Sequence, residues 1–190
     1  GIAGLSVKLK TNADLLILGA LSTSAAVGHY SAAYRLVLFV NSLAGLYATV
    51  LLPRLSRARD ESDGRDVFVA GHRVSFLIGL LLAGGGTAVA AQAVVAFVGP
   101  EFQPAGQVMT ILMAASGAIV VSLALSYTAV AHELERTYVW VVLIAAAANM
   151  LANLAFIPSY GMTAAAVTTA VTEGCILTAL GALLWRQGVR

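Results

Sequence analysis

Charged residues are scarce in this sequence. Asp, Glu, Lys and Arg make up 11% of the 190 residues, whereas hydrophobic residues make up 59%. A soluble domain carries about 25% charged residues, so a soluble fold of this composition would lack the polar groups that cover a surface. The sequence therefore predicts a membrane protein whose main surroundings are membrane lipid. The net charge of +2 is too small to indicate a nucleic acid as a partner.

Cysteine, metal-ligand patterns and nucleotide motifs are also missing or rare. The single cysteine, Cys175, lies in an apolar stretch and cannot form an internal disulfide, and no Cys/His cluster has the spacing of a metal site. Gly84-Gly85-Gly86 completes neither a dinucleotide nor a phosphate-binding motif. We expect this glycine run to be a kink or a close-packing position, and we expect no metal and no cofactor.

The start of the sequence lacks the features of a leader. Gly1-Ile2-Ala3 has no initiator methionine and no positively charged stretch before an apolar core. We therefore expect a piece of a longer protein. No second domain and no low-complexity tract is evident, so residues 1–190 are interpreted as a single membrane domain.

Long apolar stretches dominate what is present, and turn-forming residues (Gly28, Pro53, Gly99-Pro100, and Pro158 with Gly161) separate them. The last five stretches are long enough to cross about 30 Å of hydrocarbon as helices. Helices are expected because lipid offers no partners for backbone polar groups, whereas a barrel needs alternating strands of about 10 residues. The predicted fold class is an all-α integral membrane protein, a six-transmembrane-helix bundle. The six stretches cover residues 13–27, 31–52, 74–98, 108–131, 138–157 and 162–185.

Basic residues are confined to alternate connections between these stretches. The turns around Gly28, residues 99–107 and residues 158–161 contain no Lys or Arg. Because basic residues stay on the cytoplasmic side of a membrane, we expect both ends of the chain in the cytoplasm and the protein in the cell's inner membrane. The basic residues expected on the cytoplasmic side are Lys8, Lys10, Arg54, Arg57, Arg59, Arg65, Arg73, Arg136, Arg186 and Arg190.

Three ionisable residues, Asp14, Arg35 and Glu173, lie within the expected spans. A charge at the centre of a bilayer costs about 2.5–3.5 kcal/mol on insertion scales, so such residues usually face a wet cavity or one another. Asp14 and Arg35 lie close enough to span ends to reach an interface instead, whereas Glu173 lies near the middle of its span. We consider Asp14 and Glu173 as possible ion-coupling residues.

Small and polar residues form stripes at helical spacing. Along the second stretch, Ser31, Arg35, Ser42, Gly45 and Thr49 fall near one line at about 100° per residue. Such stripes either line an aqueous path or make interhelical hydrogen bonds, and we favour a polar cavity. The predicted cavity or substrate-binding residues are Arg35, Ser31, Ser42, Thr49, Asn149 and Asn153, with smaller stripes at Ser122 with Ser126 and at Thr169 with Thr172.

Several stretches, taken in order, resemble Wzx-type polysaccharide flippases over nearly the whole chain. Residues 13–19 (ADLLILG) and 26–36 (AVGHYSAAYRL) resemble the seventh and eighth helices of that family. The later stretches resemble the end of the eighth helix, an outer turn, the eleventh helix with its turn, and the start of the last helix. They are residues 50–56 (VLLPRLS), 98–102 (VGPEF), 149–154 (NMLANL), 157–162 (IPSYGM) and 164–169 (AAAVTT) followed by Glu173.

This resemblance implies the multidrug/oligosaccharidyl-lipid/polysaccharide (MOP) superfamily. Its members have two six-helix bundles with alternating access between them, so the chain would be the C-terminal lobe of a two-lobed, MATE-like transporter. The implied function is translocation of undecaprenyl-pyrophosphate-linked oligosaccharide across the cytoplasmic membrane. The implied partners are this lipid-linked glycan and the N-terminal six-helix half of the same transporter. The resemblance also implies a cationic cavity for the pyrophosphate, a role that would suit Arg35.

Other functions stay open at this point. A drug/cation antiporter or a lipid II flippase belongs to the same superfamily. A rhomboid-like protease would also have six spans, and Ser116 offers a serine, but no span contains a deep histidine to activate it. A purely structural membrane bundle has no positive indication beyond small-residue packing. We therefore expect a transporter and not an enzyme.

Overall fold

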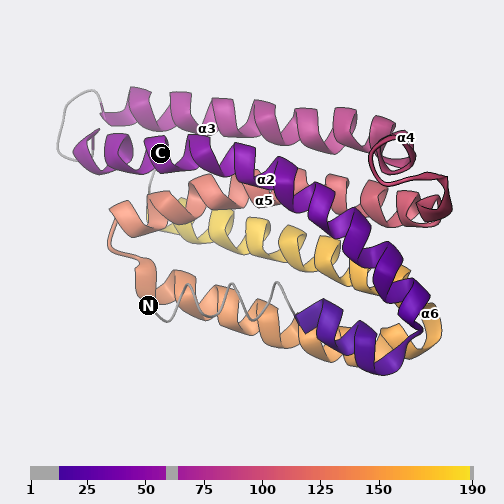
Figure 1. Ribbon diagram of the computed structural model, residues 1–190. Helices are drawn as coiled ribbons and strands as arrows, with labels where there is room; N and C mark the ends of the chain where they lie inside the picture. Colours follow the sequence, from indigo (N-terminus) through magenta and orange to yellow (C-terminus); the bar gives the residue numbers. More distant parts are fainter. Residues whose placement is uncertain (1–12, 59–63, 189–190) are drawn as a thin grey trace.

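The computed structural model describes residues 13–58 and 64–188, and the regular secondary structure of this part of the chain is all helical, with short turns between the helices. Figure 1 shows the helices running back and forth along one common direction. After a helix over residues 13–21, the elements are α2 (Ser24–Ala58), α3 (Gly64–Leu81), the π-helix η1 (Leu82–Gly86), α4 (Thr87–Phe97), the 3₁₀ turn η2 (Pro100–Phe102), α5 (Ala105–Ala131) and α6 (Glu135–Arg186).

Three of the described helices are long and apolar enough to cross a membrane. They cover Asp66–Phe97, Ala105–Ala131 and Glu135–Arg186, with lengths of 32, 27 and 52 residues. A span needs only about 20 residues, so the last is long enough for two. The all-helical, membrane-type fold expected from the composition is therefore confirmed for the described residues.

The α6 helix is two helices joined by a sharp reversal. Gly161 has φ 55° and ψ −138°, a conformation that side chains other than hydrogen disfavour. The chain folds back at this glycine, so that the first arm of α6 (residues 135–160) lies beside the second arm (residues 162–186) (Figure 1). Pro158 lies inside the first arm, so Gly161 alone provides the non-helical backbone of this turn.

The boundary between the first two stretches differs from the expected one. The helix over residues 13–21 ends at a break at Ser22 and Thr23, and α2 begins at Ser24. The Thr23 hydroxyl accepts a hydrogen bond from the backbone N–H of Ala26 at 3.2 Å, and such capping starts a helix. Gly28 is therefore inside α2, and the expectation that it marks the turn was wrong.

Two further expected boundaries were too short. Pro53 lies inside α2 and does not end it, because membrane-type helices tolerate proline. The third helix begins at Gly64, ten residues before the apolar run, so much of the expected polar loop over residues 54–73 is helical. Residues 59–63 of this loop lie outside the described residues. Apolar length therefore underestimates helix length where polar turns of helix extend beyond an apolar run.

The glycine run packs closely, as expected. Gly84-Gly85-Gly86 falls in the π-helix, a local irregularity of the kind that bends helices. A Cβ at Gly86 would collide with the side chain of Met113 on α5. The prediction of a kink or close-packing site is therefore confirmed.

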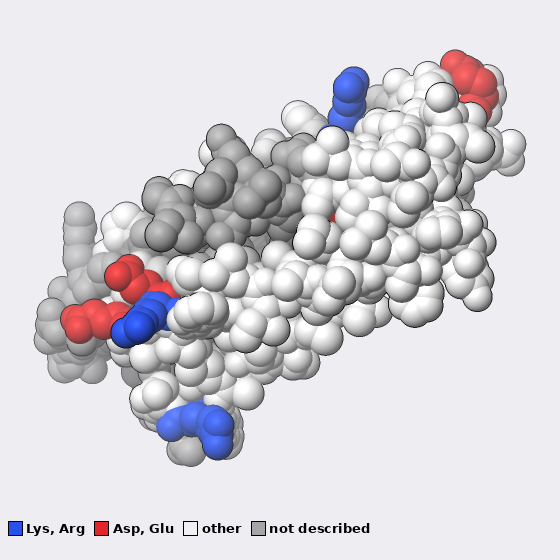
Figure 2. All heavy atoms as spheres, turned by 90° about the horizontal axis from the view of Figure 1, so that it is seen from below, with Lys and Arg blue, Asp and Glu red and all other residues white. Residues whose placement is uncertain are grey.

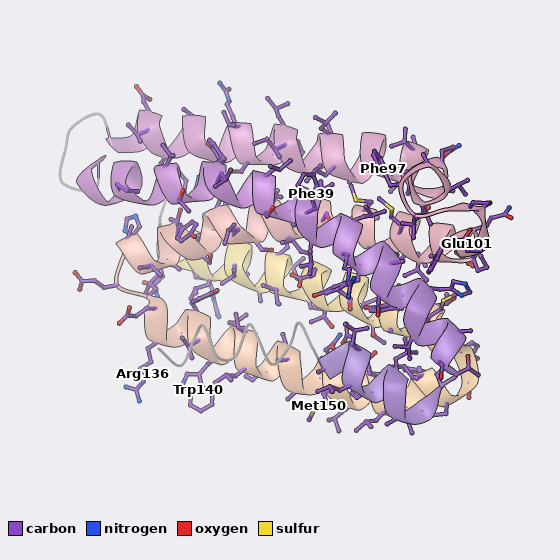
Figure 3. The ribbon with its side chains drawn as sticks, in the orientation of Figure 1. Phe39, Phe97, Glu101, Arg136, Trp140 and Met150 are labelled. Atoms are coloured by element: carbon purple, nitrogen blue, oxygen red, sulfur yellow. The ribbon has the colours of Figure 1, made fainter. Side chains whose placement is uncertain are left out.

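On the face that Figure 2 shows, most exposed charged side chains lie towards the two ends of the molecule, and largely uncharged atoms lie between them. The end at the α5–α6 turn, here called the 131–135 end, carries Arg136, whereas Glu101 lies at the opposite end with the Gly161 reversal (Figure 3). Trp140 is 58% exposed and points away from the bundle near Arg136. Tryptophan is enriched where a membrane meets water, so the position of Trp140 is consistent with the edge of a lipid-facing surface at the 131–135 end.

Candidate functional site

A buried polar cluster surrounds Asp14, which is 4% exposed. Three side chains from three other helical segments donate hydrogen bonds to its carboxylate. The Tyr30 hydroxyl of α2 donates at 3.2 Å, the Asn153 amide of the first arm of α6 at 2.6 Å, and the Thr169 hydroxyl of the second arm at 2.7 Å. Asp14 therefore joins the first helix to α2 and to both arms of α6.

The cluster continues along the two arms of α6. The Asn153 amide also donates to the Asn149 oxygen at 3.1 Å, and the Asn149 amide donates to the Thr172 hydroxyl at 3.1 Å. The Thr168 hydroxyl donates to the oxygen of Asn153. The Gly161 reversal makes this possible, because it brings one helical face of each arm against the other.

Burial explains why this many partners are present. A carboxylate removed from water is stable only when it is hydrogen-bonded or paired, and hydrogen bonds to a charged acceptor are about twice as strong as neutral ones. The same arrangement places two hydroxyl oxygens, those of Tyr30 and Thr169, beside the carboxylate. Oxygen atoms of this kind bind hard cations, and a buried carboxyl can also carry a proton.

A cavity of about 260 Å³ adjoins the cluster and lies among α2, α5 and both arms of α6. Asp14, Asn149 and Thr169 form part of its wall, and Glu173, which is 8% exposed, forms another part. The remaining polar wall residues are Tyr34, Asn41, Ser122, Ser126 and Tyr138, with apolar residues such as Val37, Leu112 and Leu180 between them.

The structure brings together part of the sequence-predicted site. Asn149, Asn153 and Asp14 share the buried cluster, and Glu173 lines the adjoining cavity. The smaller stripes, Ser122 with Ser126 and Thr169 with Glu173, meet at this same cavity. Asp14 is buried, so it does not reach an interface.

The predicted stripe on α2 lies elsewhere. Arg35, Ser42 and Thr49 are exposed and Ser31 is half-buried, and these four residues are outside the cavity wall. The Ser42 and Thr49 hydroxyls donate to carbonyls of their own helix, Phe39 O at 2.6 Å and Leu46 O at 2.8 Å. Their role in binding therefore stays a prediction about the outer face of α2.

Two polar residues, one of the Asp14 cluster and one of the cavity wall, were missed because the sequence gave them no special place. Tyr30, close to the turn expected at Gly28, is fully buried in α2 and bonded to Asp14. Asn41 is an amide inside an apolar stretch, which was visible, but it lies off the stripe of Arg35. Ser116, the candidate protease serine, is fully buried and donates to Leu112 O of its own helix at 3.0 Å.

Comparisons with known proteins agree with this fold. The sequence profile of the family described as "Polysaccharide biosynthesis protein" matches residues 1–59. A solved structure of a MOP superfamily transporter from Pyrococcus furiosus Vc1 (DSM3638), whose binding pocket of reverse polarity suggests a different function, is similar with a TM-score of 0.77 and 17% identity. The similarity covers 97% of this chain and 42% of that one. No curated protein matches the sequence.

These findings agree with the resemblance noted in the sequence: the first 59 residues are similar to a polysaccharide biosynthesis family, and the fold is similar to that of a MOP superfamily transporter. The chain has the fold of a MOP transporter and spans less than half the length of that solved structure.

Proposed function

We propose that this chain is the C-terminal lobe of a flippase that moves undecaprenyl-pyrophosphate-linked oligosaccharide across the inner membrane. One observation carries the proposal: nearly the whole chain matches 42% of a MOP transporter, while its first 59 residues match a polysaccharide biosynthesis family. The part of that transporter that this chain does not match is long enough for an N-terminal lobe of six helices. The lobe itself crosses the membrane six times, with the two arms of α6 as separate spans.

The 131–135 end faces the cytoplasm in this proposal. Arg73, Arg136 and Arg186 belong to helix segments at that end, whereas Glu101 lies in the opposite turn. The other predicted cytoplasmic basic residues lie outside the described side chains. This arrangement supports the positive-inside orientation, and the proposal includes both ends of the chain in the cytoplasm.

The outer face of α2 borders the substrate path. Arg35, Ser42 and Thr49 are exposed there among large apolar side chains such as Phe39. An arginine facing lipid at this depth is costly, so the face is better suited to a wet cavity shared with the N-terminal lobe. A guanidinium in that cavity binds a pyrophosphate with paired hydrogen bonds.

The Asp14 cluster couples transport to a cation gradient. Its carboxylate joins the first helix, α2 and both arms of α6. A cation or proton that binds there changes the balance of these contacts and thereby biases the packing of four helical segments. Glu173, in the adjoining cavity, is the second candidate for this role.

A drug/cation antiporter remains the alternative, and it rests on a specific observation. The similar transporter from Pyrococcus furiosus is described as having a different function within the same superfamily, so the fold fits several substrates. A lipid II flippase fits equally by fold. Export of surface glycan, compared with drug resistance in the same cells, separates these functions.

Substitutions in the full-length protein test the flippase. In cells whose surface glycan depends on this protein, Arg35→Ala and Glu173→Ala are expected to abolish glycan display and to accumulate lipid-linked precursor in the inner leaflet. Arg73→Ala removes an exposed arginine from the 131–135 end and should leave display normal. Normal display by both Arg35→Ala and Glu173→Ala, at normal membrane levels, would rule out this function for these residues.

A further inference from the structure

The cavity beside the Asp14 cluster is elongated along the bundle. On the second arm of α6 its wall runs from Thr169 to Leu180, about 16 Å at 1.5 Å per residue. On α5 it runs from Leu112 to Ser126, five residues before that helix ends at Ala131. Tyr138, three residues into α6, also lines it. The cavity therefore extends from Asp14 towards the 131–135 end.

Two buried polar atoms on this wall have no hydrogen-bond partner among the described residues. They are the hydroxyl oxygen of Ser122, a residue 5% exposed, and the amide oxygen of Asn41. Buried polar atoms in native proteins are nearly always satisfied by protein, water or a ligand. A volume of about 260 Å³ holds several waters at about 30 Å³ each. These atoms therefore indicate a wet cavity.

The charge of the wall has one sign. The described residues that line the cavity include Asp14 and Glu173 and contain no Lys, Arg or His. A narrow cleft whose charges are all negative and whose other walls are apolar concentrates cations and repels anions. The unpartnered amide oxygen of Asn41 can only accept a hydrogen bond or bind a cation. The charge of the wall and its hydrogen-bonding capacity therefore both favour cations over anions.

We infer that this cavity is a water-filled passage for monovalent cations between the 131–135 end and Asp14, and that Glu173, Ser122 and Asn41 are the cation-binding groups of its wall. Its use in coupling rests on the function proposed above, whereas its selectivity does not. The cation is monovalent because Glu173, Ser122 and Asn41 together offer a single carboxylate and two neutral oxygens. Among the described residues no group of three His, Cys, Asp or Glu side chains is placed to hold a metal ion, whereas calcium sites use several carboxylates.

Thiol labelling of the purified full-length protein tests the inference. Cys175, which is exposed, is first replaced by serine, and Ser122→Cys is then introduced. Reaction rates are measured with a trimethylammonium methanethiosulfonate, which is always positive, and with a sulfonate methanethiosulfonate, which is negative, each relative to a small free thiol. We expect a preference of about tenfold or more for the positive reagent. Adding Glu173→Gln should lower that preference by about fivefold.

A control, a second cavity variant and a separate export measurement accompany this experiment. Ile144→Cys places a thiol on the apolar outer surface, where the side chain is 66% exposed, and should react with neither reagent in detergent. Asn41→Cys repeats the measurement from another helix if Ser122→Cys fails to fold. Equal normalised rates, or no reaction of either folded cavity variant, would overturn the passage. Normal glycan export by Asp14→Asn would instead overturn the coupling role and leave the labelling result intact.

Discussion

Each hydrogen bond to the Asp14 carboxylate is expected to stabilise the fold, and the bond from Thr169 can be tested on its own. Thr169→Val removes the hydroxyl that donates to Asp14 at 2.7 Å and keeps the side-chain shape. Because hydrogen bonds to charged groups contribute about 1.5–3 kcal/mol, we expect the free energy of unfolding to fall by about that amount. Denaturant titration of the full-length protein in detergent measures it.

Thr178→Val is the matched control for this change. Thr178 lies on the same arm of α6, is exposed, and donates to carbonyls of its own helix, Gly174 O and Cys175 O. An exposed substitution of this kind usually changes stability by less than about 0.5 kcal/mol. Equal losses from Thr169→Val and Thr178→Val would mean that the bond to Asp14 contributes no more than an ordinary surface hydroxyl.

The sequence indicated some of the site residues and not others, for physical reasons. Asp14, Glu173, Asn149 and Asn153 were predicted because polar groups in apolar helices need partners. Which partners they have depends on how distant segments pack: the Asn153 amide and Asp14 are 139 residues apart in the chain. Helical periodicity describes one helix at a time, so it could not assign Tyr30 to Asp14.

Between elements, α3 and α5 approach each other closely at a pair of glycines, Gly79 and Gly117. A Cβ on Gly117 would lie 2.7 Å from Gly79 O and 2.8 Å from Ala83 Cβ. Gly117→Ala therefore forces the two helices apart, and overpacking of this kind costs about 1–3 kcal/mol. We expect the midpoint of thermal unfolding in detergent to drop.

Gly181→Ala provides the comparison, because nothing lies within 4 Å of a Cβ at that position. Alanine in a helix is about 0.5–1 kcal/mol more favourable than glycine, so this variant should be as stable as the original or slightly more so. If both substitutions changed the midpoint alike, close packing at the Gly79–Gly117 contact would not be the cause.

Element boundaries show the limit of apolar patterning. The apolar run of α5 began at 108 and the helix at Ala105, a close agreement because proline and glycine precede it. The expected turn at Gly28 was wrong because the break lies five residues earlier, where Thr23 caps the start of α2. Glycine in a long membrane-type helix does not end it without a change of backbone conformation, and such a change occurs at Gly161.

For the molecule as a whole, the proposed orientation gives a direct test. In a Cys175→Ser background, Gln103→Cys lies in the turn after η2 and Glu135→Cys lies at the start of α6, and both residues are exposed. We expect a membrane-impermeant maleimide added to intact cells to label the first variant and not the second. Labelling of both should follow once the membrane is permeabilised, and the reverse pattern in intact cells would invert the topology.

The reversal at Gly161 has a consequence for how the protein is made. Asn149 and Asn153 are synthesised before Thr168 and Thr172, which supply their partners across the turn. Until the second arm leaves the ribosome, the Asn149 amide nitrogen and the Asn153 oxygen would face hydrocarbon without these two partners, an unfavourable exposure. The two arms are therefore suited to leave the translocation channel together, as one hairpin whose polar seam is already closed when lipid reaches it.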